Sequence, residues 1–109
     1  MSTPVVSNEI ANEFAIPSEK ALLHAARLAI EQDKPIMLDY YIETRDGKAF
    51  LGEDNVNSEK KMLVKSEEEY TSYIIKIFKI VNDFIIITEN SIYIVSGAMK
   101  KKKISMPAE

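Results

Sequence analysis

Residues 73–96 read YIIKIFKIVNDFIIITENSIYIVS, and this stretch decides the fold. Isoleucine, valine and aromatic side chains dominate it, which is typical of strands on a half-buried sheet. Two interruptions, at residues 81–83 and 89–91, have the spacing of hairpin turns. The stretch therefore predicts three antiparallel strands in a meander.

Apolar side chains point to both faces of this predicted meander. In the middle strand, Ile85 and Ile87 lie on one side and Ile86 lies on the other. A sheet with two apolar faces must be covered on both sides or must close on itself. We therefore expect either a barrel or a second subunit that supplies a missing layer.

One firm helix is predicted ahead of the meander, over residues 18–32. Ser18 is the expected N-cap, with Glu19 in the first turn. The side expected to pack on the sheet consists of Leu22, Leu23, Ala25, Ala26, Ala29 and Ile30. His24 and Arg27 are expected on the solvent side of this amphipathic helix.

Three short strands are predicted between this helix and the meander. Residues 36–43 alternate between apolar and polar side chains, as a half-buried strand does. Residues 44–47 have a hairpin signal that ends in glycine, and residues 48–52 return as the second strand. Residues 53–58 are expected to form a polar loop, followed by a short strand at residues 62–64.

Together these elements predict an α+β, mainly β domain. We expect an N-terminal amphipathic helix and a five- to six-stranded antiparallel sheet that curls into a small SH3/Sm-like barrel; a two-layer helix-on-sheet arrangement is the alternative. Residues 1–15 are expected to be a loosely ordered arm, in which Ile10 and Phe14 dock on the core. Residues 16–98 are expected to form a single globular domain, and residues 99–109 a basic, flexible tail.

Composition argues against several functional classes. The chain has no cysteine, which excludes disulfides, thiolate metal sites and cysteine catalysis. A net charge of -3 argues against general affinity for nucleic acid or anionic membranes. The apolar runs are too short to span a membrane, and the first residues lack the pattern of a signal peptide. We therefore expect an intracellular, soluble protein.

No pattern of residues predicts catalysis, a metal site or a cofactor. His24 is the only histidine and is expected to face solvent. Asp39 and Glu43 share the face of a predicted strand, where carboxylates ordinarily provide solubility. The three glycines form no phosphate-binding motif. We expect no catalytic, cofactor-binding or metal-binding residues, and hence no enzyme.

Two features favour binding of a partner. The chain has one basic run, which consists of Lys100, Lys101, Lys102 and Lys103. This run is suited either to contact nucleic acid or to keep the apolar meander soluble. Tyrosine is enriched at interfaces, and the candidate interface residues are Tyr41, Tyr73 and Tyr93.

Residues 46–52, DGKAFLG, follow the predicted helix and the alternating strand. This order resembles the first half of an Sm-like RNA-binding barrel over residues 18–64, and the resemblance implies a small barrel. Ser96 and Gly97 stand where that family has an Arg-Gly pair near the last strand.

A second resemblance rests on KPIMLDYY, KMLVKSEEEYTS and ITENSIYIVS. The pattern of residues in these segments resembles short uncharacterised proteins of large DNA viruses. It implies a virus-encoded accessory or packaged protein, located in the host cytoplasm or the virion.

The leading hypothesis is a non-enzymatic interaction module that self-associates, as a homo-oligomer, or binds a protein through its β-surface. The alternative is a small nucleic-acid-binding barrel that uses the run of four lysines.

Overall fold

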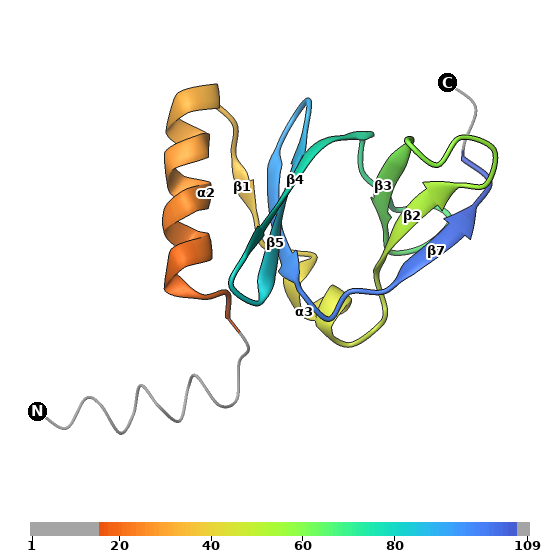
Figure 1. Cartoon of the computed structure of the whole chain (residues 1–109), viewed down its shortest axis with the longest axis horizontal. Helices are drawn as coiled ribbons and strands as arrows, with labels where there is room; N and C mark the ends of the chain where they lie inside the picture. Colours follow the sequence, from red (N-terminus) through yellow and green to blue (C-terminus); the bar gives the residue numbers. More distant parts are fainter. Residues whose placement is uncertain (1–15, 107–109) are drawn as a thin grey trace, which may run out of the picture.

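The computed structural model describes residues 16–106, which form three layers (Figure 1). Helix α2 (Glu19–Gln32) covers one face of a four-stranded sheet, and a three-stranded sheet lies over the other face. The expected mixed, mainly β fold is confirmed. The described strands form two separate sheets and no closed barrel, so the expected barrel is not confirmed.

The four-stranded sheet has the order β1-β6-β5-β4. Strands β4 (Ile74–Ile80), β5 (Asp83–Thr88) and β6 (Ile92–Ser96) pair antiparallel in sequence order, which confirms the predicted meander. The short strand β1 (Ile36–Met37) adds to β6 in parallel. As a result, β4 lies at one edge of this sheet.

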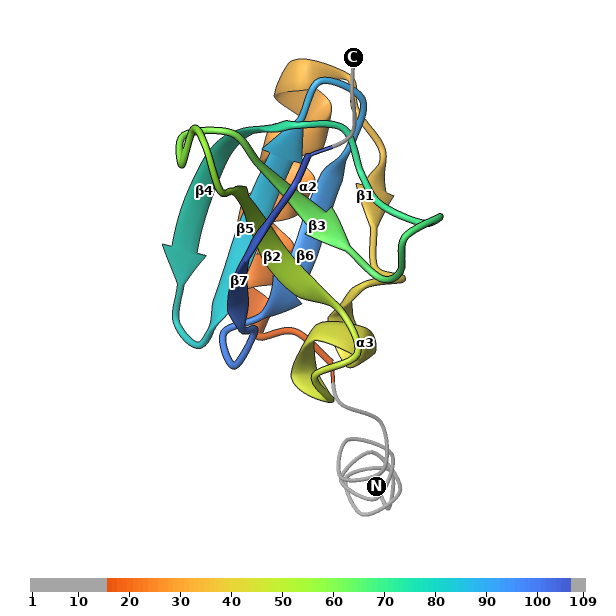
Figure 2. The same cartoon turned by 90° about the vertical axis from the view of Figure 1, so that its right-hand side faces the viewer.

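The three-stranded sheet has the order β3-β2-β7 and crosses in front of the other sheet in Figure 2. Strand β2 (Phe50–Asp54) pairs antiparallel with β3 (Lys61–Val64) and parallel with β7 (Lys101–Ile104). Strand β7 lies within the segment that we expected to be a flexible tail. The polar loop expected to begin at residue 53 begins later, because β2 continues to Asp54.

The two buried clusters explain why the meander is apolar on both faces. Ile85 and Ile87 of β5 pack with the helix residues Ala21 and Ala25. Ile86, between them, faces the opposite way and belongs to the cluster that lies between the two sheets. Both covering layers come from this chain, so the meander does not require a second subunit to bury its faces.

Helix α2 begins as predicted, and Ala25 and Ala29 of the predicted face pack on the sheet. The Ser18 hydroxyl accepts a hydrogen bond from the Ala21 backbone N–H at 3.1 Å, which confirms the N-cap. The prediction of the packed face is wrong in part, because Leu23 and Ile30 are 61% and 83% exposed. Alanines 21 and 25 are the fully buried positions, since a small side chain lets the helix approach the isoleucines of the sheet closely.

The predicted strand over residues 36–43 is wrong beyond Met37. Residues Tyr41–Arg45 form the short helix α3, and the expected hairpin at residues 44–47 is not formed. The buried Thr44 hydroxyl explains the difference, since it donates to the Tyr40 carbonyl and accepts from the Ser96 N–H at 3.0 Å. Gly47 follows α3 with a φ of 80°, in the left-handed region that glycine favours.

Within residues 16–106, no helix is long and apolar enough to cross a membrane. The predicted docking of Ile10 and Phe14 falls outside the described residues.

Candidate binding groove

A groove lies on the outer face of the three-stranded sheet, the face turned away from the four-stranded sheet. Across β2 and β3, Phe50 lies opposite Val64 and Gly52 lies opposite Met62. Alternate residues of a strand point to the same face, so these four positions share the outer face. The residues between them point inward to the cluster between the sheets.

Strand β7 adds a wall through Ile104, which shares this face with Gly52. A Cβ atom built on Gly52 would lie 2.6 Å from the terminal Cδ1 carbon of Ile104. The glycine therefore leaves the space above β2 into which the Ile104 side chain folds. Any larger residue at position 52 would push Ile104 outward.

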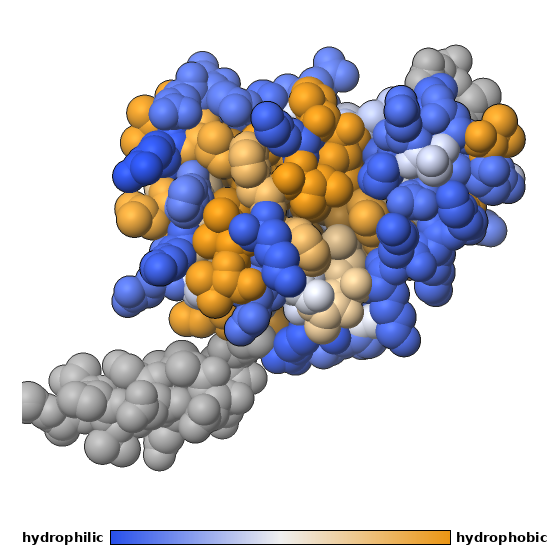
Figure 3. Space-filling model, viewed as in Figure 1, coloured by the Kyte–Doolittle hydropathy of each residue, from blue (hydrophilic) through white to orange (hydrophobic). Residues whose placement is uncertain are grey.

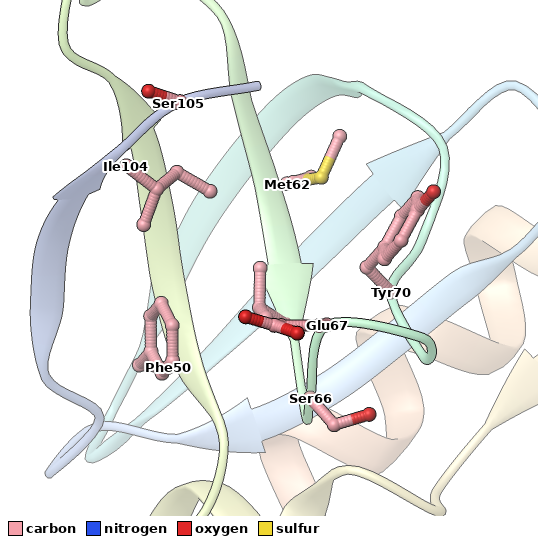
Figure 4. Close-up of a pocket in the computed structure, with 8 residues that line it drawn as sticks. Phe50, Met62, Ser66, Glu67, Tyr70, Ile104 and Ser105 are labelled. Atoms are coloured by element: carbon pink, nitrogen blue, oxygen red, sulfur yellow. The ribbon is translucent and has the colours of Figure 1, made fainter. Parts of the chain in front are cut away.

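The segment after β3 forms the second wall. The Ser66 hydroxyl accepts hydrogen bonds from the backbone N–H groups of Glu68 and Glu69, at 3.2 and 3.1 Å. Tyr70 forms a β-bridge with Val64, which returns the chain to β3. These bonds hold the segment against the sheet, so that Glu67 and Tyr70 line the groove (Figure 4).

The groove has a volume of about 560 Å³. Its lining residues are Phe50, Met62, Val64, Ser66, Glu67, Tyr70, Ile104 and Ser105. Figure 4 shows these side chains converging from three strands and from the segment after β3. A volume in this range is typical of sites that hold a small ligand or a large side chain of a partner.

Charge is distributed unevenly around the apolar lining. Glu67 is exposed and makes no ion pair with any of residues 16–106. At the other wall, the Lys102 ammonium lies 4.5 Å from the centre of the Phe50 ring, in a cation–π contact. The Glu67 side is therefore able to attract a positive group of a ligand.

The predicted basic run does not form one basic surface. Lys101 and Lys103 point to one face of β7 and pair with the Glu53 carboxylate at 3.4 and 3.2 Å. Lys102 points to the other face, and Lys100 precedes the strand. Hydrogen bonding from Lys103 and Lys101 lowers the pKa of Glu53, which is almost fully buried.

The three candidate interface tyrosines are half-buried in this structure. The Tyr41 hydroxyl donates to Asp83, and Tyr93 packs edge-on against the buried ring of Tyr40 at 5.4 Å between centroids. A lysine ammonium lies 5.5 Å from the centre of the Tyr73 ring. The structure does not bring these three tyrosines into the groove.

The residues that the sequence analysis weighed for catalysis or metal binding lie apart from one another on the surface. His24 is exposed on α2, and Asp39 pairs with Lys65 at 3.4 Å. Across the described part of the chain, no three carboxylate or histidine side chains are placed to hold a metal ion. The groove was not predicted from the sequence. The one local signal for it was a glycine at position 52, two residues after Phe50 and therefore on the same face of the strand, where it leaves an open space.

Comparison of the chain with models of protein families, with curated proteins and with solved structures found no match.

Proposed function

We propose that this chain is a non-enzymatic protein-interaction module and that the groove on its three-stranded sheet is the binding surface. The observation that carries the proposal is an apolar groove, open to solvent, whose shape depends on a glycine in the middle of β2. Surfaces of this kind mark sites at which a partner buries apolar side chains.

The groove fits a short segment of a partner protein that carries one large apolar side chain next to Lys or Arg. The apolar side chain would bury itself among Phe50, Met62 and Ile104, which accounts for most of the favourable free energy. The basic residue would pair with Glu67, which has no ion pair within residues 16–106. Such a pair at the rim favours correct orientation more than it adds affinity.

NMR titration of the isotope-labelled chain tests this proposal. The probe is a short peptide that contains Phe-Lys-Lys between Gly and Ser residues. We expect amide shifts around Phe50, residues 62–70 and Ile104, and weaker binding of the matched peptides with Ser for Phe or with Glu-Glu for Lys-Lys. Shifts confined to other surfaces, or none at millimolar peptide, would overturn the proposal.

Two neighbouring glutamates provide a matched pair of variants. Glu67→Lys reverses the charge in the groove and should weaken binding of the Phe-Lys-Lys peptide several-fold. Glu68→Lys makes the same change one residue away, at an exposed position outside the lining, and should leave binding nearly unchanged. If the two variants weaken binding equally, the peptide responds to the overall charge of the chain and not to a contact with Glu67 in the groove.

A nucleic-acid ligand is the competing outcome of the same titration. A single-stranded oligonucleotide that binds in low salt, and loses binding when the four lysines at positions 100–103 become serine, would favour that alternative. The pairing of Lys101 and Lys103 with Glu53 supports the protein partner instead. The resemblance to proteins of large DNA viruses would make this module an intracellular accessory or packaged protein.

A further inference from the structure

Strand β4 lies at the edge of the four-stranded sheet, after β5 in the strand order. Strand β4 has seven residues, and no strand within residues 16–106 pairs with its outer side. Ile75 and Ile77 are 64% and 37% exposed along it. Figure 3 has the same orientation as Figure 1, and it shows apolar side chains in the middle of the molecule, where Figure 1 places β4. An exposed apolar edge strand is a template on which another strand can pair.

We propose that two copies of this chain form a twofold-symmetric dimer in which their β4 strands pair antiparallel, with Phe78 at the symmetry axis. The two four-stranded sheets then join into one continuous sheet. This inference uses a surface other than the groove, so it stands or falls independently of the proposed function.

The backbone of β4 restricts how such a pair can form. Ile80 and Asp83 flank the two-residue turn between β4 and β5, so they form a hydrogen-bonded pair. Hydrogen-bonded pairs alternate along an antiparallel ladder, so the peptide groups of Ile77 and Lys79 point away from β5 to the open edge. Two β4 strands therefore bond most fully when Ile77 of each lies opposite Lys79 of the other.

The side chains agree with this register. It places Phe78 opposite Phe78, Lys76 opposite Ile80 and Ile77 opposite Lys79. Cross-strand aromatic pairs stabilise a sheet, whereas like charges placed directly opposite destabilise it. A shift by one residue would set Lys76 against Lys79 and would also turn one strand's peptide groups inward.

Two other registers also satisfy the backbone. With Lys79 at the axis, the two Lys79 side chains would lie directly opposite each other, which is destabilising. An irregularity in β4 argues against the register with Ile77 at the axis. The pairing of β4 with β5 is regular from Lys76 to Ile80 but shifts between Ile74 and Lys76. With Ile77 at the axis, this shifted segment would have to join the new ladder. With Phe78 at the axis, the new ladder uses only the regular part of the strand.

The expected dimer is weak and closed. One pair of short strands buries less surface than a stable protein interface requires, so association should be visible only at high protein concentration. The twofold axis uses up the open edge of both copies, which stops growth at two. Lysines on an edge strand oppose indiscriminate pairing, and this register places each of them against an apolar residue.

Sedimentation velocity over a series of concentrations tests the dimer. Ile77→Lys places a charge against Lys79 and should leave a monomer at every concentration. Ile75→Lys is the matched control, because it adds the same charge at a more exposed residue outside the paired segment, and should retain the dimer. A monomeric unmodified chain, or a dimer that persists in Ile77→Lys, would overturn the proposal.

A proline at the edge separates backbone pairing from side-chain effects. Lys79→Pro removes an N–H that points to solvent in the monomer, which edge strands tolerate. The far-ultraviolet circular dichroism of the variant should match the unmodified chain, while its dimer is lost. A folded Lys79→Pro variant that still dimerises would refute pairing through β4.

Engineered cysteines test the register, because the chain has none of its own. A mixture of Ile77→Cys and Lys79→Cys chains should form a disulfide that joins one copy of each under mild oxidation. The opposite residues of a hydrogen-bonded pair are about 5.5 Å apart at Cα, within disulfide range. Each variant alone should crosslink far less; equal crosslinking alone and in the mixture would refute the register. The Glu67→Lys change in the groove should leave both results unaltered.

Discussion

The Tyr41 hydroxyl donates a hydrogen bond to the buried Asp83 carboxylate, with 2.7 Å between the two oxygens. The second carboxylate oxygen of Asp83 accepts from the Ser18 backbone N–H at 2.9 Å. One side chain at the start of β5 therefore ties down both α3 and the beginning of α2. Tyr41, a candidate interface residue on sequence grounds, uses its hydroxyl within the chain.

We expect Tyr41→Phe to lower the free energy of unfolding by about 1.5–3 kcal/mol at neutral pH, the contribution of a hydrogen bond to a charged group. Burial and the bond to Asp83 raise the pKa of Tyr41 from 10.0 to about 12. The protonated phenol stabilises the folded state, so this contribution is complete below pH 10.0 and is lost as the pH rises towards about 12.

Urea unfolding as a function of pH measures this effect. The difference between the unmodified chain and Tyr41→Phe should shrink over that alkaline window. Tyr70→Phe is the control, since Tyr70 is 44% exposed and should lose little stability. Identical unfolding midpoints for the Tyr41→Phe and Tyr70→Phe variants would contradict the structural role of Tyr41.

Val81→Gly should stabilise the fold. Val81 occupies the first position of the β4–β5 turn with a φ of 59°, in the left-handed region that β-branched residues rarely adopt. This conformation costs an L-residue about 1–2 kcal/mol, and glycine's greater freedom in the unfolded chain offsets part of the gain.

Thermal unfolding should therefore show Val81→Gly to be more stable by roughly 0.5–1 kcal/mol. Val56→Gly provides the comparison, because Val56 is also exposed, at 90%, but does not have a positive φ. That variant should be neutral or slightly less stable. A Val81→Gly chain that melts below the unmodified one would show that the valine contributes contacts worth more than the strain.

Gly97→Ala should destabilise the fold strongly. A Cβ atom on Gly97 would overlap the backbone carbonyl oxygen of Asn82, to which the Gly97 N–H donates a hydrogen bond of 2.8 Å. Backbone cannot move aside as a flexible side chain can, so we expect a loss of about 1–3 kcal/mol or more. Gly47→Asn is the control: its surroundings are open, and asparagine tolerates a positive φ.

Because of the Glu53 carboxylate, we expect the stability of the fold to fall at acid pH. Because the neighbouring lysines lower its pKa below 4.5, the Glu53 carboxylate stabilises the folded state above that pH, and the contribution is lost as the pH falls through the lowered value. Glu53→Gln should therefore reduce the melting temperature at neutral pH and approach the unmodified chain in acid.

Asp54→Asn, next to it on β2, is the control for Glu53→Gln, because Asp54 forms no ion pair with any of residues 16–106. A difference between Glu53→Gln and the unmodified chain that does not change with pH would mean that shape rather than charge is responsible.

Local signals in the sequence predicted several elements correctly. Ser18 caps α2 and residues 73–96 form the meander, because each depends on neighbouring residues alone. The alternation in residues 36–43 was ambiguous. Tyr40 and Thr44 are one helical turn apart, and the hydrogen bond from Ser96 of β6 to the Thr44 hydroxyl is a tertiary contact that favours the helix there.

The apolar pattern of the meander by itself determined that both faces of this sheet would be buried, because side chains alternate strictly along a strand. What buries them was decided by tertiary structure. Strand β7 pairs with β2 across about half the chain, and pairing over that distance leaves no local pattern in either segment. The groove depends on that pairing, because Ile104 reaches the space above Gly52 only when β7 lies beside β2.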